Sequence, residues 1–131
     1  MEYRFNRSMP DDIISLSKRS GTRILSRISA VTALKNSLFT VGIYDGDVLV
    51  AFGRVCGDDA LCFVVCDVMV DEAYREQHLE VQILKELDTY LRSVVTRESQ
   101  VYVHVSRPYD EVCQRYGFKY LDGDYEVMMK R

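Results

Sequence analysis

The sequence lacks a long apolar run and an excess of positive charge. No stretch reaches the length of about 20 apolar residues that a membrane-spanning helix needs, and Met1–Arg7 has no apolar core of a signal peptide. Lys and Arg number 17 against 20 Asp and Glu, which gives a formal net charge of −3. Because nucleic-acid binders usually carry a basic excess, we expect a cytoplasmic protein that binds neither nucleic acid nor membranes.

Residues that commonly bind metals are also scarce. The chain has four cysteines, at positions 56, 62, 66 and 113, and none forms a Cys-x-x-Cys pair. Its two histidines, His78 and His104, are far apart in the sequence. Three cysteines lie in strand-like segments, so we interpret the cysteines as small buried apolar residues in a reducing compartment. We therefore expect no metal site and no disulfide.

Linkers, internal repeats and low-complexity segments are absent as well. The chain has 131 residues, of which 47% are hydrophobic and 28% charged, as is typical of a globular protein. This length suits one domain with one buried core. We therefore expect residues 1–131 to form a single domain.

The N-terminal part predicts one strand and two helices. Glu2–Asn6 alternates between apolar and polar residues, as a strand does. A helix follows in which Ser8 caps the start and Pro10 occupies the first turn, and Gly21 closes it in a left-handed conformation. Residues 22–37 are compatible with a second helix that has a break near Ser26, and we interpret this part as two short helices joined at Gly21–Arg27.

The middle of the chain predicts a meander of three antiparallel strands at residues 38–44, 48–56 and 61–70. Asp45-Gly46 indicates a tight hairpin in which both central residues have positive φ. Leu61–Val70 is almost continuously apolar, as in a strand buried on both faces. Asp67 is its only charged residue.

The C-terminal part predicts a parallel βαβ unit and a final hairpin. Leu79–Thr96 has the apolar spacing of an amphipathic helix, and Val101–Val105 alternates as a strand. A short helix at residues 108–115 precedes a strand from Phe118, a turn at Asp122-Gly123 and a closing strand at Tyr125–Lys130. The fold expected is an α/β (α+β) domain with a mixed, mostly antiparallel sheet of six to seven strands and about four helices.

Four segments follow this order of elements at a characteristic spacing: Val48–Val55, Cys66–Val70, Tyr74-Arg75 and Tyr116-Gly117-Phe118. In these segments, and over nearly its whole length, the chain resembles the GNAT superfamily of N-acetyltransferases, in particular its small bacterial members. This resemblance implies an acetyltransferase that uses acetyl-CoA as cosubstrate. The acetyl group would pass to a primary amine of a small molecule or peptide by direct attack, and a homodimer is a further expectation.

The resemblance also implies which residues bind the cofactor. In the family, the strand corresponding to Cys66–Val70 bulges and splays away from its parallel neighbour, so that free backbone groups pair with the pantetheine arm of CoA. Those groups belong here to Val68, Met69 and Val70. The pyrophosphate turn of the family maps onto the next segment, and Ser106 is a further candidate; the residues are Arg75, Glu76, Gln77, His78, Leu79 and Glu80.

The turn departs from the family pattern at two positions. His78 and Glu80 stand where the family has small residues, chiefly glycine, which lets phosphate approach the backbone. A carboxylate roughly 5 Å from the pyrophosphate would repel it by about 3 kcal/mol at an effective dielectric near 20. The alternative is that the acidic first turn only stabilises the helix dipole.

The catalytic residues are less clearly indicated. A lone carboxylate in an apolar strand, Asp67 is a candidate base for the amine proton; alternatively it bonds to backbone N–H groups at the bulge. Cys113 occupies the position of the family's acidic tyrosine, and it is either the proton donor or a small buried residue. Tyr116 and Tyr109 are substitutes that lie off the motif.

Two further interpretations of the chain remain open. Arg23, Arg27 and Arg54 either line the site of the amine acceptor or are ordinary surface charges. The whole domain, having lost the glycine turn and the tyrosine, is either an enzyme, a non-catalytic binding or regulatory module, or a structural and dimerising domain.

Overall fold

The computed structural model describes residues 1–131 and is built around one five-stranded sheet. The strands are β1 (Glu2–Phe5), β2 (Phe39–Asp45), β3 (Val48–Gly57), β4 (Cys62–Val70) and β5 (Gln100–Val103). They lie in the sheet in chain order, antiparallel except for the parallel pair β4–β5. The helices are α1 (Pro10–Arg19), α2 (Arg27–Lys35), the 3₁₀ helix η1 (Glu72–Gln77), α3 (Leu79–Val94) and α4 (Tyr109–Gln114). The expected βαβ unit is confirmed, with α3 as its crossover.

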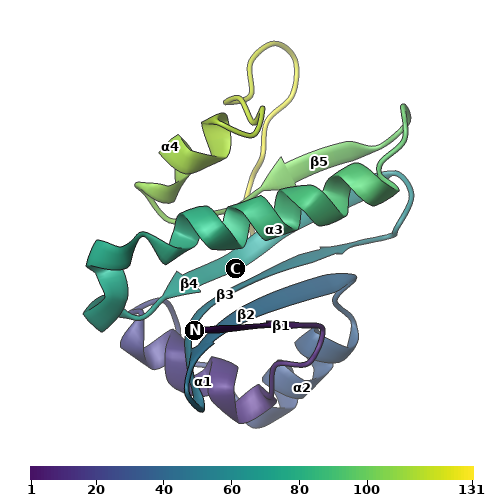
Figure 1. Ribbon diagram of the computed structural model, residues 1–131. Coiled ribbons are helices and arrows are strands. Elements are labelled where there is room, and N and C mark those ends of the chain that lie inside the picture. Colours follow the sequence, from purple (N-terminus) through teal and green to yellow (C-terminus); the bar gives the residue numbers. More distant parts are fainter.

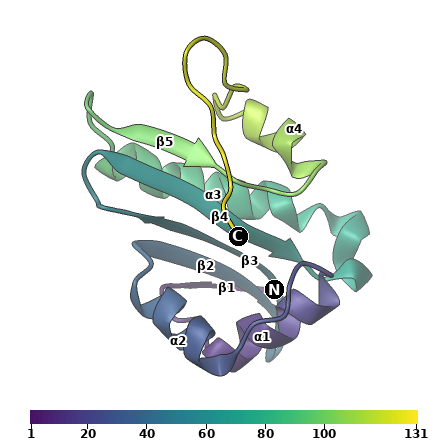
Figure 2. The same ribbon diagram turned by 180° about the vertical axis from the view of Figure 1, so that it is seen from behind.

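Helices cover both faces of the sheet (Figures 1 and 2). The long helix α3 lies across one face, and its apolar stripe, Ile83, Leu84, Leu87 and Leu91, is buried in the larger core. On the other face, α1 and α2 bury a smaller core that includes Tyr44 and Phe52. None of the helices is long and apolar enough to cross a membrane.

Gly53 of β3 lets α3 lie close to the sheet. A Cβ atom at this position would come 2.5 Å from Cγ2 of Ile83 and 3.0 Å from Cδ1 of Leu87. Such separations are well below van der Waals contact, so any larger residue would push α3 away. This close packing fixes the start of α3 relative to the end of β4, which is where the candidate site lies.

Local signals in the N-terminal part are confirmed in outline and corrected in detail. The two short helices joined near residues 21–27 are confirmed, because α1 ends at Arg19 and α2 begins at Arg27, where Ser26 caps it and accepts a hydrogen bond from Ser29 N. Ser8 does not cap α1; Met9 holds that position, and the buried Ser8 Oγ has no hydrogen-bond partner. The β2–β3 turn is Gly46-Asp47, with positive φ only at Gly46, as in a type II′ hairpin.

The expected C-terminal strands are absent, so the sheet has five strands rather than six to seven. No backbone–backbone hydrogen bond involves residues 119–131. Gly123 does adopt positive φ in a turn, but no hairpin forms around it. Figures 1 and 2 show that the segment runs across the direction of β5 instead of alongside it, so it does not pair with the outer edge of β5.

Candidate functional site

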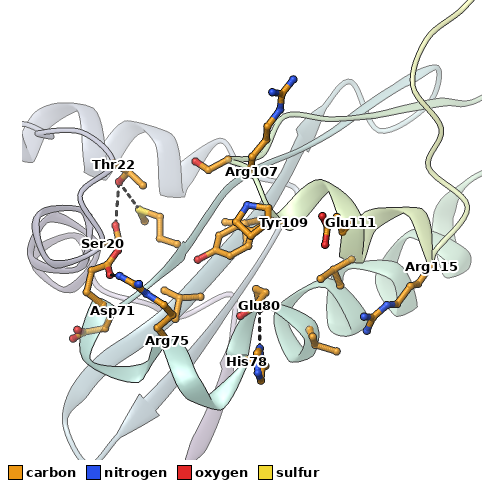
Figure 3. Close-up of a pocket in the computed structure, with 18 residues that line it drawn as sticks. Ser20, Thr22, Asp71, Arg75, His78, Glu80, Arg107, Tyr109, Glu111 and Arg115 are labelled. Carbon is orange, nitrogen blue, oxygen red and sulfur yellow. Dashed lines mark hydrogen bonds and ion pairs between the residues drawn. The ribbon is translucent and has the colours of Figure 1, made fainter.

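A cavity of about 930 Å³ opens beside the end of β4. It is bounded by the loop after α1, by η1 and the first turn of α3, and by α4 with the segment before it (Figure 3). Seven of the residues predicted to bind the cofactor line it: Val68, Met69, Val70, Arg75, His78, Glu80 and Ser106. Glu76, Gln77 and Leu79 do not line the cavity.

A bulge in β4 shapes one wall of the cavity. The β3–β4 register shifts between Phe52, which pairs with Met69, and Arg54, which pairs with Cys66. Asp67 and Val68 therefore stand together opposite a single residue, and Asp67 has a φ of 53°. Strand β5 pairs with β4 only as far as Val65. The end of β4 thus bulges and splays away from β5, as the resemblance implied.

His78 carries the backbone conformation that a glycine would adopt without strain. It joins η1 to α3 in the left-handed region, with φ 52° and ψ 44°. Its imidazole is 73% exposed, and Nδ1 lies 3.5 Å from Oε1 of Glu80, whose side chain is only 13% exposed. His78 therefore differs from the family's glycine in its side chain, while its backbone conformation is one that glycine adopts.

Arginines surround the cavity and offset its carboxylates. Arg75 pairs with Glu72, and Arg107 and Arg115 also line the cavity. The carboxylate of Asp71 is held by Arg19 at 2.7 Å. Arg107 and Arg115 lie outside the turn motif, so the sequence carried no signal for them. Guanidinium groups bind phosphates well, and these residues therefore reduce the repulsion expected from the acidic turn.

Solved structures with the same fold are numerous, although no family model and no curated protein matches the sequence. A probable acetyltransferase from meticillin-resistant Staphylococcus aureus has a TM-score of 0.90 and 27% identity over 99% of this chain and 98% of that chain. The chain has the GNAT fold.

Two further GNAT-fold neighbours are more distant. A GNAT-family acetyltransferase from Streptococcus pneumoniae has a TM-score of 0.74 and 21% identity over 99% of this chain and 98% of that chain. A predicted acetyltransferase with acetyl-CoA from Clostridium acetobutylicum has a TM-score of 0.69 and 16% identity over 97% and 95% of the two chains. These likenesses support the fold.

Tyr109, the first residue of α4, places its ring in the middle of the GNAT cavity (Figure 3). Burial raises the pKa of its phenol, the negative charges of Glu80 and Glu72 raise it further, and Arg75 opposes them. The hydroxyl therefore stays protonated at neutral pH and can donate a proton. Tyr109 lies one helical turn before Cys113, and that spacing was the one signal in the sequence that could have favoured it.

The residues at the position of the GNAT acid motif do not reach the cavity. Cys113 is 2% exposed and belongs to the core beneath α3, where burial raises its pKa to about 11. Tyr116 lies beside the outer surface of α3, near Lys85 and Arg92. Neither residue lines the cavity.

Asp67 is held by two arginines. Its Oδ2 accepts a hydrogen bond from Nε of Arg54 at 2.7 Å, and its Oδ1 accepts one from Nη2 of Arg23 at 2.6 Å. Partial burial raises the pKa of the preceding Cys66 thiol to about 12. Both carboxylate oxygens of Asp67 are thus engaged, and its partners are side chains rather than the backbone N–H groups considered above.

Proposed function

We propose that this protein is an N-acetyltransferase that transfers the acetyl group of acetyl-CoA to a primary amine. The observation that carries the proposal is the cavity beside the bulged and splayed end of β4. Its backbone wall suits a pantetheine arm, and its arginines suit the phosphates of CoA. A structural neighbour with acetyl-CoA supports the same cosubstrate.

The reaction needs few groups of the protein. The amine nitrogen attacks the thioester carbonyl, a C–N bond forms and the C–S bond breaks. The amine gives up one proton, and the departing thiolate gains one. Backbone N–H groups in Val68–Val70 hold the thioester and polarise its carbonyl. Because Asp67 is already paired with two arginines, the amine proton passes to water in this scheme.

Tyr109 is the proton donor in this proposal. Replacing it by phenylalanine keeps the ring but removes the proton, so we expect Tyr109→Phe to lower kcat by about a hundredfold or more. The raised pKa of Tyr109 means that the wild-type rate falls only at alkaline pH, above the ordinary phenol value of about 10. The variant should lack this alkaline limb.

The control for this measurement is Tyr116→Phe, which removes a hydroxyl outside the cavity. A pH profile of kcat for both variants separates the two tyrosines. If Tyr109→Phe keeps the wild-type rate and pH profile, the proton reaches the thiolate by another route and the assignment of Tyr109 is wrong.

Binding of acetyl-CoA tests the proposed function directly. Calorimetric titration should give a dissociation constant in the micromolar range. Free acetyl-CoA at about 100 times that constant should stabilise the fold by about 2.7 kcal/mol, visible as a thermal shift. No heat and no shift at millimolar acetyl-CoA would overturn the proposal and favour a non-catalytic binding module with the GNAT fold.

A further inference from the structure

A cluster of two arginines and one carboxylate adjoins residues that line one end of the cavity. Arg23, in the loop after α1, and Arg54, in β3, both bind Asp67 in the β4 bulge. Arg23 and Asp67 are 44 residues apart in the chain, so their ion pair ties the loop to the strand. Neither arginine lines the cavity in which CoA is proposed to bind.

Sequence neighbours place this cluster next to the reacting end of the cavity. Thr22, beside Arg23, and Val68, beside Asp67, both line the cavity. In Figure 3, Thr22 lies at the opposite side from His78 and Arg115, which belong to the phosphate end. The ion pair therefore adjoins the point where an amine would meet the thioester.

The cluster carries one uncompensated positive charge. Two guanidinium groups face one carboxylate, and Arg23 forms no other ion pair. Arg54 is 17% exposed and gives its second hydrogen bond to Ser37, whereas Arg23 is 61% exposed and donates only to Asp67. A guanidinium has five N–H donors, so Arg23 keeps exposed donors free beside Thr22, which lines the cavity.

The ion pairs of the cluster and the backbone conformation of Asp67 restrain each other. Asp67 has left-handed φ, which a residue other than glycine keeps only where its surroundings over-determine it. Its two arginine partners provide that restraint from two different elements. Arg23 is thereby oriented before any acceptor arrives, which reduces the entropic cost of binding one.

We propose that the acceptor is a primary amine that also carries a carboxylate, and that Arg23 binds this carboxylate. The proposal rests on the acetyltransferase function proposed above and names its substrate class. One negative charge matches the single uncompensated charge of the cluster, whereas a phosphate would bring two. The planar guanidinium also matches a carboxylate in geometry. Asp67 and Arg54 act as positioning residues for Arg23.

Steady-state kinetics with matched acceptor pairs tests the proposal. Each pair consists of an amino acid and its carboxamide, compared at equal concentration of neutral amine. We expect the wild type to prefer the carboxylates by about tenfold to a hundredfold in kcat/KM, which is the size of one charge-assisted hydrogen bond. Arg23→Gln should remove this preference and leave the KM for acetyl-CoA unchanged.

Arg27→Gln is the matched control, because Arg27 is 66% exposed and also forms one ion pair, with Asp11. It should keep the preference of the wild type. The proposal is overturned if the wild type uses acids and amides equally, or if Arg23→Gln and Arg27→Gln behave alike, while acetyl-CoA still binds. Loss of acetyl-CoA binding in the wild type would instead overturn the proposed function itself.

Discussion

At the scale of single residues, the turn before α3 keeps the backbone conformation expected of the family but carries different side chains. The sequence shows a histidine and a glutamate where the family has small residues, and this pattern predicted an impaired phosphate site. In the structure His78 nevertheless takes the left-handed path of a glycine, and its ring points into solvent. Glu80 turns inward, near His78 and Tyr109. The Cβ atom of His78 and the charge of Glu80 therefore oppose phosphate binding in two separate ways, one steric and one electrostatic.

We expect His78→Gly to stabilise the fold and to tighten the binding of acetyl-CoA. A left-handed conformation costs a residue with a Cβ about 1–2 kcal/mol, and the flexibility of glycine takes back about 0.5–1 kcal/mol. The free energy of unfolding should therefore rise by up to about 1.5 kcal/mol, as measured by urea denaturation. Combining it with Glu80→Gly should tighten binding further, because a negative charge is removed.

His104→Gly is a suitable control, since His104 is exposed and has no positive φ. It should destabilise the fold slightly and leave acetyl-CoA binding unchanged. Weaker binding by the His78→Gly variant would show that the imidazole itself contacts a phosphate.

At the scale of elements, the site depends on the contact between β3 and α3. Gly53 stands opposite the bulge of β4 and beneath Ile83 of α3. The sequence predicted both the helix and the strand from their periodicity. It did not show that a glycine is needed where they cross, because that need arises only when the two elements pack.

Gly53→Ala should destabilise the protein by about 1–3 kcal/mol, because the new Cβ overpacks against Ile83 and Leu87. The same substitution should cost less in an Ile83→Ala background, where the clashing Cγ2 is gone. Chemical denaturation of the four variants of this cycle measures the difference. An equal cost in both backgrounds would mean that the clash is not the cause.

At the scale of the whole molecule, the C-terminal segment and the outer edge of β5 both lack backbone hydrogen-bond partners. Strand β5 pairs only with β4, so its outer edge is free. Residues 119–131 make no backbone hydrogen bond to the rest of the chain. Tyr125, Val127 and Met129 alternate with Glu126, Met128 and Lys130 in the manner of a strand, yet Tyr125 is 75% exposed and Met129 64%.

We expect the chain to form homodimers in which this segment of one subunit adds to the free edge of β5 in the other. Exchange of two such segments would bury roughly 1,200 Å² or more, enough for a stable interface. Sedimentation equilibrium should show a dimer at micromolar concentration, and Val127→Asp should dissociate it.

Val48→Asp serves as the control for this prediction, because Val48 is an exposed valine of β3 with an exposure of 49% against 69% for Val127. It should leave the dimer intact. A wild-type protein that sediments as a monomer throughout would contradict the prediction and leave the segment as an unpaired tail.

The sequence by itself determined the elements whose signals are local. The 3.6-residue period of α3, the apolar run of β4 and the break between α1 and α2 near Ser26 each depend on neighbours a few residues away. The order of these elements and their motifs resembles the GNAT superfamily, and that resemblance implied a role for Val68–Val70, which line the cavity. Such patterns are legible in the sequence because helix and strand periodicity follow from backbone geometry alone.

The tertiary structure alone decided which side chains meet. The partners of Asp67 lie 44 and 13 residues away in the chain, and no periodicity in the sequence predicts these contacts. The orientation of α4 brings Tyr109 into the cavity and Cys113 into the core. The last strands failed as predictions because a strand needs an edge to pair with, and the path of the chain, not the alternation of residues 125–130, determines whether one is within reach.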